Sequence, residues 1–166
     1  MRVAGLVQDS IVDGPGLRFV VFVQGCPHHC PGCHNPESHD PKGGEELPVE
    51  GIARQMLNNP LTDGLTLSGG EPFEQAWECS YLARNASWNG LNVWAYTGYT
   101  FEHLRDHGTL AQKALLNKVD VLVDGPYKQE ERSLNLPWRG SKNQRIIDVR
   151  ASLNAGTVIE WRADNG

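Results

Sequence analysis

Short apolar runs, separated by turn residues or by longer amphipathic stretches, are the main pattern of this chain. The runs are rich in β-branched and aromatic residues. Several of them are apolar without alternation, which is typical of strands buried on both faces of a sheet. We predict strands over residues 19–23, 65–67, 93–96, 119–123, 145–149 and 158–161.

The stretches between these runs have helical periodicity, and we predict helices over residues 49–57, 74–86 and 101–116. The last of them is expected to begin after the cap residue Thr100 and to break at Gly108. Cys79 falls on the apolar stripe of the second helix, together with Ala76, Ala83 and Ala86. We therefore interpret Cys79 as a small core residue.

Strands that alternate with helices indicate parallel βαβ units. A complete eightfold barrel takes about 250 residues, whereas this chain has 166. We therefore expect an α/β fold in which one domain, residues 1–166, forms a partial (βα) barrel with one side open. Residues 39–46 are predicted to be a polar loop, and no internal repeat or linker is evident.

The charge balance excludes several classes of partner. The chain has 15 Lys and Arg against 20 Asp and Glu, a formal net charge of -5. This balance is atypical of proteins that bind nucleic acids or anionic membranes. No apolar run approaches the roughly 20 residues that span a bilayer, and Gln8, Asp9 and Asp13 interrupt any signal-peptide core. We expect a cytoplasmic protein without a nucleic-acid or membrane partner.

Three cysteines, Cys26, Cys30 and Cys33, follow the predicted strand 19–23 with the spacing C-x3-C-x2-C. In a reducing compartment such a cluster indicates a metal site or a redox motif. Structural zinc would need a fourth ligand, which His28, His29, His34 or His39 could provide. Covalent haem would need an export route and would leave Cys26 unexplained, and a thioredoxin-like dithiol normally uses two cysteines.

An iron–sulfur cluster is the fourth interpretation of this motif. Four-iron clusters usually take four thiolates. Three cysteines in one loop would leave one iron open to a small molecule, as catalytic metal sites keep one position free. The absence of a fourth cysteine from the loop is therefore informative.

Further motifs carry a resemblance to known enzymes. The cysteine triad together with Gly69-Gly70-Glu71-Pro72, about 35 residues downstream, resembles the radical S-adenosylmethionine superfamily. The segment Ser10–Arg18, with Asp13-Gly14-Pro15-Gly16, resembles the leader of activases of glycyl-radical enzymes. Residues 120–125 and 138–145 resemble the activases of anaerobic ribonucleoside-triphosphate reductase. The resemblance extends from about Gly5 to Val149.

This resemblance implies a radical S-adenosylmethionine barrel in which Cys26, Cys30 and Cys33 ligate a [4Fe–4S] cluster and act in catalysis through it. S-adenosyl-L-methionine would chelate the open iron and be cleaved by one electron to a 5′-deoxyadenosyl radical. That radical would take a hydrogen from a glycine of the reductase, leaving a glycyl radical. A flavodoxin or a ferredoxin-type protein is the implied electron donor.

The resemblance also implies residues that bind S-adenosylmethionine, with Gly69 and Gly70 receiving its amino group. The full predicted set is Gly32, His34, Gly69, Gly70, Glu71, Thr97 and Asp124. Two positions depart from the family pattern, because Gly32 replaces an aromatic residue and Pro126 replaces a lysine. The histidines of the cysteine loop are expected to be neutral or turned away from the sulfurs, in a solvated loop.

Other functions compete with this one. The chain could activate another glycyl-radical enzyme, such as pyruvate formate-lyase, or act on a small molecule, as deazaguanine synthases of the same superfamily do. A zinc-binding scaffold and an electron-transfer protein are the remaining classes. The second of these would normally use four cysteines.

Overall fold

The computed structural model describes residues 1–28, 30–32, 36–133 and 135–163. In this part of the chain, strands form one seven-stranded sheet with the order β3-β1-β2-β4-β5-β6-β7. Strands β2, β4, β5 and β6 are parallel, whereas β1, β3 and β7 are antiparallel to their neighbours. The strands are β1 (Arg2–Ser10), β2 (Arg18–Val23), β3 (Glu45–Glu46), β4 (Gly64–Gly69), β5 (Asn92–Tyr96), β6 (Val121–Asp124) and β7 (Arg145–Asp148).

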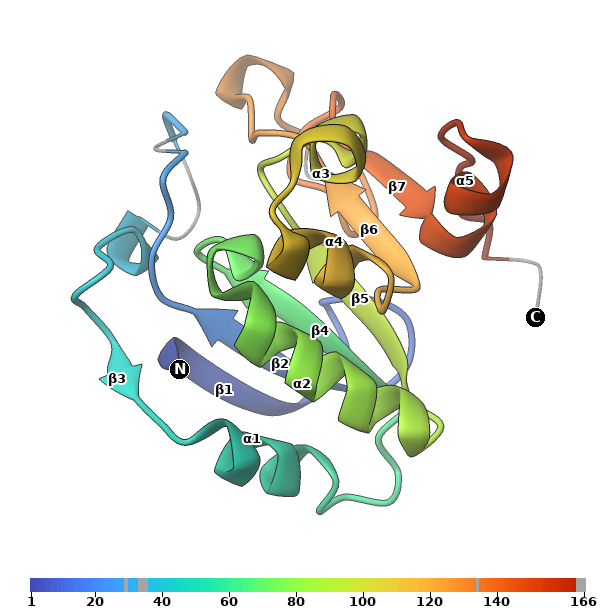
Figure 1. The fold of residues 1–166 in the computed structure, drawn as a ribbon. Helices are drawn as coiled ribbons and strands as arrows, with labels where there is room; N and C mark the ends of the chain where they lie inside the picture. The colour runs from blue at the N-terminus through green and yellow to red at the C-terminus, as the bar shows by residue number, and fades with distance from the viewer. Residues whose placement is uncertain (29, 33–35, 134, 164–166) are drawn as a thin grey trace.

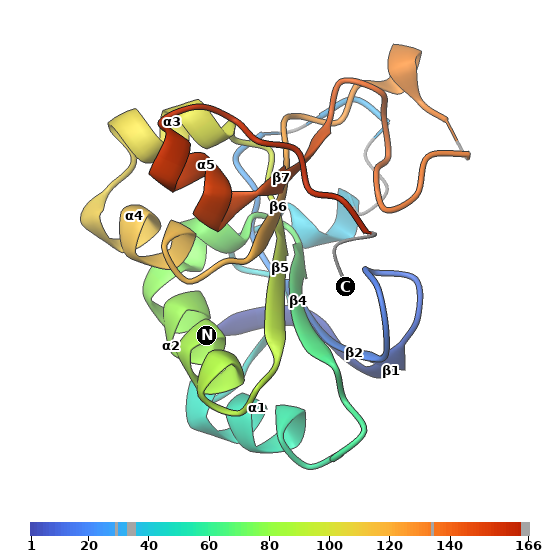
Figure 2. The ribbon, with the colours of Figure 1, turned by 90° about the vertical axis from the view of Figure 1, so that its right-hand side faces the viewer.

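Helices cover one face of the sheet, and the loops that follow the parallel strands gather at one edge (Figures 1 and 2). The helices are α1 (Val49–Met56), α2 (Ala76–Trp88), α3 (Phe101–His107), α4 (Leu110–Leu116) and α5 (Val149–Ala155). Short 3-10 turns lie at Pro36–Ser38, Pro72–Gln75 and Gln129–Glu131. The expected α/β partial barrel is confirmed. Within the described residues, no helix has both the length and the apolar character needed to cross a membrane.

The helix predictions agree well with the structure. Thr100 caps α3 by accepting a hydrogen bond from the backbone N–H of His103 (3.1 Å), and the predicted break at Gly108 separates α3 from α4. The predicted helix 74–86 begins instead as a 3-10 turn over Pro72–Gln75 and continues as α2 to Trp88. Local signals decide these boundaries, because a cap and a glycine act within one turn of a helix.

The strand predictions contain four errors, one of which is that the short strand β3 lies within the predicted polar loop 39–46. Strand β1 was not predicted, so the strand before the cysteines is the second and not the first. Strand β7 runs antiparallel to β6, and α5 follows it. The predicted strand 158–161 is wrong, because only Glu160 forms a bridge, with Ile147. Segments at a sheet edge are half exposed, and their polar positions obscure the apolar pattern.

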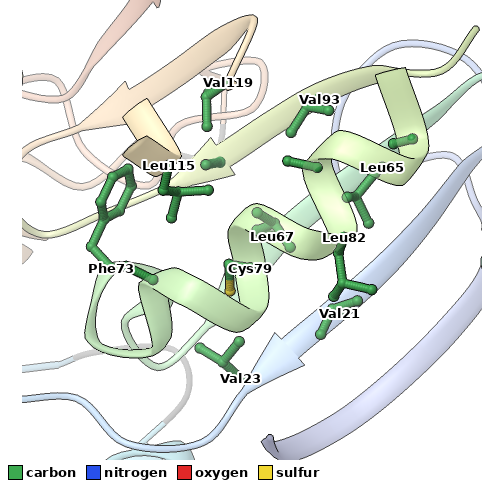
Figure 3. Packing of buried hydrophobic residues seen from close by; sticks show 14 of the residues in the cluster. Val21, Val23, Leu65, Leu67, Phe73, Cys79, Leu82, Val93, Leu115 and Val119 are labelled. Carbon is green, nitrogen blue, oxygen red and sulfur yellow. The ribbon is translucent and has the colours of Figure 1, made fainter. Parts of the chain in front are cut away.

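The apolar core lies between the sheet and helices α2 and α4 (Figure 3). Cys79 of α2 is fully buried there among Val23, Leu67 and Leu82. Burial raises the pKa of its thiol above the ordinary range. The interpretation of Cys79 as a core residue is confirmed.

The other face of the sheet holds a buried cation. Arg18 of β2 is fully enclosed and donates hydrogen bonds to the Thr66 hydroxyl (2.7 Å) and to the carbonyls of Leu65 and Pro15 (2.9 Å each). Its guanidinium carbon lies 5.7 Å from the ring centroid of Trp94. Because burial disfavours the charged form, the pKa of Arg18 falls to about 10. The Gly-Pro leader therefore anchors the start of β2.

A second cation joins β6, β7 and α3. Asp124, at the end of β6, is buried and receives two hydrogen bonds from Arg145 of β7 (3.0 and 2.6 Å). The same carboxylate accepts a hydrogen bond from the backbone N–H of Phe101 (2.7 Å), the first residue of α3. Arg145 also pairs with Glu102 (2.6 Å) and lowers the pKa of that carboxyl. This network fixes the end of β6 beside the cysteine loop.

Replacing Gly64 by alanine is expected to lower the free energy of unfolding by about 1–3 kcal/mol. A Cβ at this position would lie 2.5 Å from the Arg18 guanidinium nitrogens. Urea unfolding of the metal-free protein measures the change. Gly5→Ala is the matched control in a strand, because no atom lies within 4 Å of its Cβ position. We expect an effect below about 0.5 kcal/mol for this control, and equal effects would contradict the analysis.

Arg145→Met is expected to destabilise the protein by about 3 kcal/mol, the lower end for a broken buried pair, because 34% of the Arg145 side chain is exposed. The exposed Arg150→Met serves as control and should change stability by less than about 0.5 kcal/mol. The pKa of Glu102 is lowered from 4.5 in the folded state. The contribution of Glu102 to folding stability is therefore present above pH 4.5 and is lost as the pH falls. The difference between wild type and Arg145→Met should therefore shrink in acid. A constant difference would exclude Glu102 from the network.

Candidate functional site

One cavity opens at the edge where the parallel strands end. Its walls come from the cysteine loop, from the ends of β4 and β5, from the loop after β6 and from the segment before β7. Cys26, Cys30, Gly69, Gly70 and Thr97 all line it. The structure therefore brings together five of the residues that the sequence motifs single out, from three separate parts of the chain.

The cysteine loop is closed at its base by backbone hydrogen bonds. Gly25 N–H donates to the Ser38 carbonyl (2.6 Å) and Cys26 N–H donates to that of His39 (3.1 Å). Cys26 and Cys30 are partly exposed and form no disulfide. The remaining predicted ligand, Cys33, and the predicted cofactor contact His34 lie outside the described residues, as does His29. Among the side chains that the structure does describe, no three metal-binding ones gather around a common point.

Gly69 and Gly70 join the end of β4 to the end of β2. A Cβ on Gly69 would lie 2.6 Å from the Val23 nitrogen, and one on Gly70 would lie 2.4 Å from the Gly25 carbonyl oxygen. Gly69 also has a φ of 90°, which favours glycine. The backbone N–H of Gly70 donates to the Val23 carbonyl (2.8 Å). Both glycines are therefore required by packing, and both also present their backbone to the cavity.

Glu71 is buried beside the cavity, and its predicted contact with the cofactor stays a prediction. Its carboxylate is fully buried and accepts hydrogen bonds from the backbone N–H groups of Phe73 (3.0 Å) and Gly98 (2.8 Å) and from the Thr97 hydroxyl (2.9 Å). His28 of the cysteine loop lies 2.6 Å from the same carboxylate. The side chain connects β4, β5 and the cysteine loop, and a cofactor would meet its neighbours Gly69 and Gly70.

Thr97 follows β5 and Asp124 is the last residue of β6, but the two residues contribute differently. Thr97 lines the cavity, although its hydroxyl donates to Glu71 and accepts from the Tyr99 N–H (3.1 Å). Asp124 belongs to the Arg145 network, and the following residue, Gly125, lines the cavity in its place. Their predicted contacts with the cofactor stay predictions.

Gly32 is in contact with the loop that follows β6. It has a φ of 71°, and a Cβ built on it would lie 2.7 Å from the Gln129 Cδ. The Gln129 side chain therefore occupies the space where a larger residue at position 32 would place its side chain. This contact fills the space that glycine leaves at position 32.

Sequence reasoning missed Gln144 and Tyr127, which also line the cavity. Gln144 accepts hydrogen bonds from the N–H groups of Gly140 (2.8 Å) and Ser141 (3.2 Å) and donates to the Gly125 carbonyl (3.1 Å). It thereby folds the segment 138–145 onto the loop after β6. The motif containing Gln144 was recognised from the sequence, but the individual role of this residue depends on contacts with a distant loop.

Comparison with known proteins agrees with this site. The family described as "4Fe-4S single cluster domain" matches residues 12–147. The anaerobic ribonucleoside-triphosphate reductase-activating protein of Vibrio cholerae is 38% identical over 145 residues, which cover 82% of this chain and 91% of that protein. The protein of the same name from Escherichia coli is 34% identical over 151 residues, covering 85% and 94% respectively.

A solved structure, that of QueE from Escherichia coli, aligns with 74% of this chain and 70% of its own at 13% identity and a TM-score of 0.48. The family match covers most of the sequence, and the relatives are matched over nearly their whole length. This chain belongs to the family of anaerobic ribonucleoside-triphosphate reductase-activating proteins, which contains a 4Fe-4S single cluster domain.

Proposed function

We propose that this protein is a radical S-adenosylmethionine enzyme that generates a glycyl radical on anaerobic ribonucleoside-triphosphate reductase. The observation that carries the proposal is the shared cavity: Cys26 and Cys30 line it together with the paired glycines at the end of β4. Membership of the activating-protein family supports the same function.

The donor set fits an iron–sulfur cluster. Cys26 and Cys30 are partly exposed on a loop that lines the cavity, and thiolates are the ligands that such clusters take. We propose Cys33 as the third ligand, which leaves one iron for S-adenosyl-L-methionine. When bound, the reduced [4Fe–4S] cluster supplies the electron that cleaves the sulfonium and yields a 5′-deoxyadenosyl radical.

The residues around the cavity would bind and orient the cofactor. The backbone of Gly69 and Gly70 is accessible there because neither residue carries a side chain, and carbonyl oxygens accept hydrogen bonds from an ammonium group. We propose Gly32, His34, Glu71, Thr97 and Asp124 as further contacts. The buried Glu71 carboxylate also ties the turn after Gly70 to Phe73 and Gly98.

The glycine of the reductase must approach the same cavity. We propose that its loop enters this cavity near the cysteine loop and the segment that contains Tyr127 and Gln144, since both line it. The electron donor is proposed to be a flavodoxin or a ferredoxin-type protein. Its contact surface would lie close to the cysteine loop, because electrons reach a cluster most easily over short distances.

Anaerobic reconstitution tests the cluster. The wild-type protein is expected to bind about four irons per chain and to release 5′-deoxyadenosine with dithionite and S-adenosylmethionine. Cys26→Ala and Cys30→Ala should lose the iron and the cleavage. Cys79→Ala is the matched control and should keep both, because Cys79 lies in the core. Stoichiometric zinc without cleavage in the wild type would overturn the proposal.

The partner is tested by electron paramagnetic resonance of the reductase after incubation with the reconstituted protein. A glycyl-radical signal is expected, and it should be absent when the radical-bearing glycine of the reductase is replaced by alanine. Cleavage of S-adenosylmethionine without a radical on this reductase would show that the protein activates something else.

A further inference from the structure

We propose that His28 is a positioning residue that clamps the cysteine loop to the end of β5 before any cluster is bound. The importance of the clamp for catalysis rests on the proposed function, but its existence does not. His28 lies between Cys26 and Cys30, two residues from each. The expectation of a solvated histidine is wrong here, because only 17% of the His28 side chain is exposed.

The first contact of the clamp is with Glu71. The His28 Nε2 lies 2.6 Å from the Glu71 Oε1 and donates to it, because a carboxylate oxygen accepts. Glu71 is itself held by backbone N–H groups of Phe73 and Gly98 and by the Thr97 hydroxyl. The histidine is therefore attached to a group that is fixed to both β4 and β5.

The second contact is steric. A Cβ on Gly98 would lie 2.5 Å from the His28 Cδ2, so the imidazole occupies space that only glycine leaves open. The edge of the Tyr99 ring borders the same imidazole, with ring centroids 4.6 Å apart and an angle of 80° between the planes. Tyr99 is held in turn by its hydroxyl contact with Glu74 and by stacking on His103.

These contacts place one tether between two cysteines. The backbone bonds of Gly25 and Cys26 hold the loop at its base. The His28 clamp adds an attachment at the centre of the Cys26–Cys30 segment, on the wall of the cavity. A loop held in this way keeps its cysteines close to the geometry that binds metal. It therefore loses less conformational entropy when the metal binds.

Hydrogen exchange of the metal-free, reduced protein tests the clamp directly. In His28→Ala, the amides of Cys26, His28, Cys30, Gly32 and Gly98 should exchange roughly ten- to hundredfold faster, the range for losing a hydrogen bond to a charged group. The exposed His107→Ala is the matched control and should leave exchange in the loop unchanged. Unchanged exchange in His28→Ala would overturn the proposal.

Two further variants separate the clamp from general loss of stability. Gly98→Ala changes neither His28 nor Glu71, but its methyl group takes the space that the imidazole occupies. It should therefore accelerate amide exchange in the cysteine loop as His28→Ala does. His28→Gln keeps a side-chain N–H donor and should restore part of the protection. Equal exchange rates in His28→Gln and His28→Ala would show that the imidazole acts through ring packing alone. That result would contradict the role of the hydrogen bond to Glu71.

The reconstituted protein gives an independent readout. The electron paramagnetic resonance spectrum of its reduced cluster should change in His28→Ala and return toward the wild-type shape in His28→Gln. Failure of the wild type to bind iron would overturn the proposed function and leave the exchange result standing. Faster loop exchange with an unaltered cluster spectrum would show that the clamp does not position the ligands.

Discussion

The candidate site depends on one buried negative charge. The Glu71 carboxylate accepts hydrogen bonds from its own turn, from the end of β5 and from the cysteine loop. Burying a carboxylate costs several kcal/mol, and hydrogen bonds to charged groups contribute about 1.5–3 kcal/mol each. Each donor offsets part of this cost, so the charge holds three distant segments in one geometry.

Glycines make this convergence possible. At Gly69, Gly70 and Gly98 a Cβ would collide with Val23, with Gly25 and with His28, respectively. The same absence of side chains that allows the segments to pack also leaves backbone groups facing the cavity. These glycines can therefore have a structural and a ligand-binding role at once, because both roles depend on the absence of a Cβ.

Aromatic side chains cover part of the sheet face that lies opposite the helices. Trp94 of β5 is covered by Trp138 and Trp161 in edge-to-face contacts, at centroid distances of 5.4 and 5.0 Å. Trp161 also donates its backbone N–H to Ile146 of β7. A short chain thus shields the buried Arg18 without the additional strands of a full barrel. The predicted strand 158–161 has this covering role instead, as a segment with few backbone bonds to the sheet.

The sequence by itself determined the continuous apolar strands, the cap at Thr100, the break at Gly108, the core position of Cys79 and the motifs that indicate the cluster, because each depends on neighbours within a few residues. It did not determine the direction of β7 or the roles of His28, Glu71, Asp124 and Gln144. Those roles depend on hydrogen bonds that join residues between 19 and 43 positions apart. A polar side chain can bind a ligand or stabilise the fold. Which of the two roles it has depends on the hydrogen-bond partners that the tertiary structure places beside it.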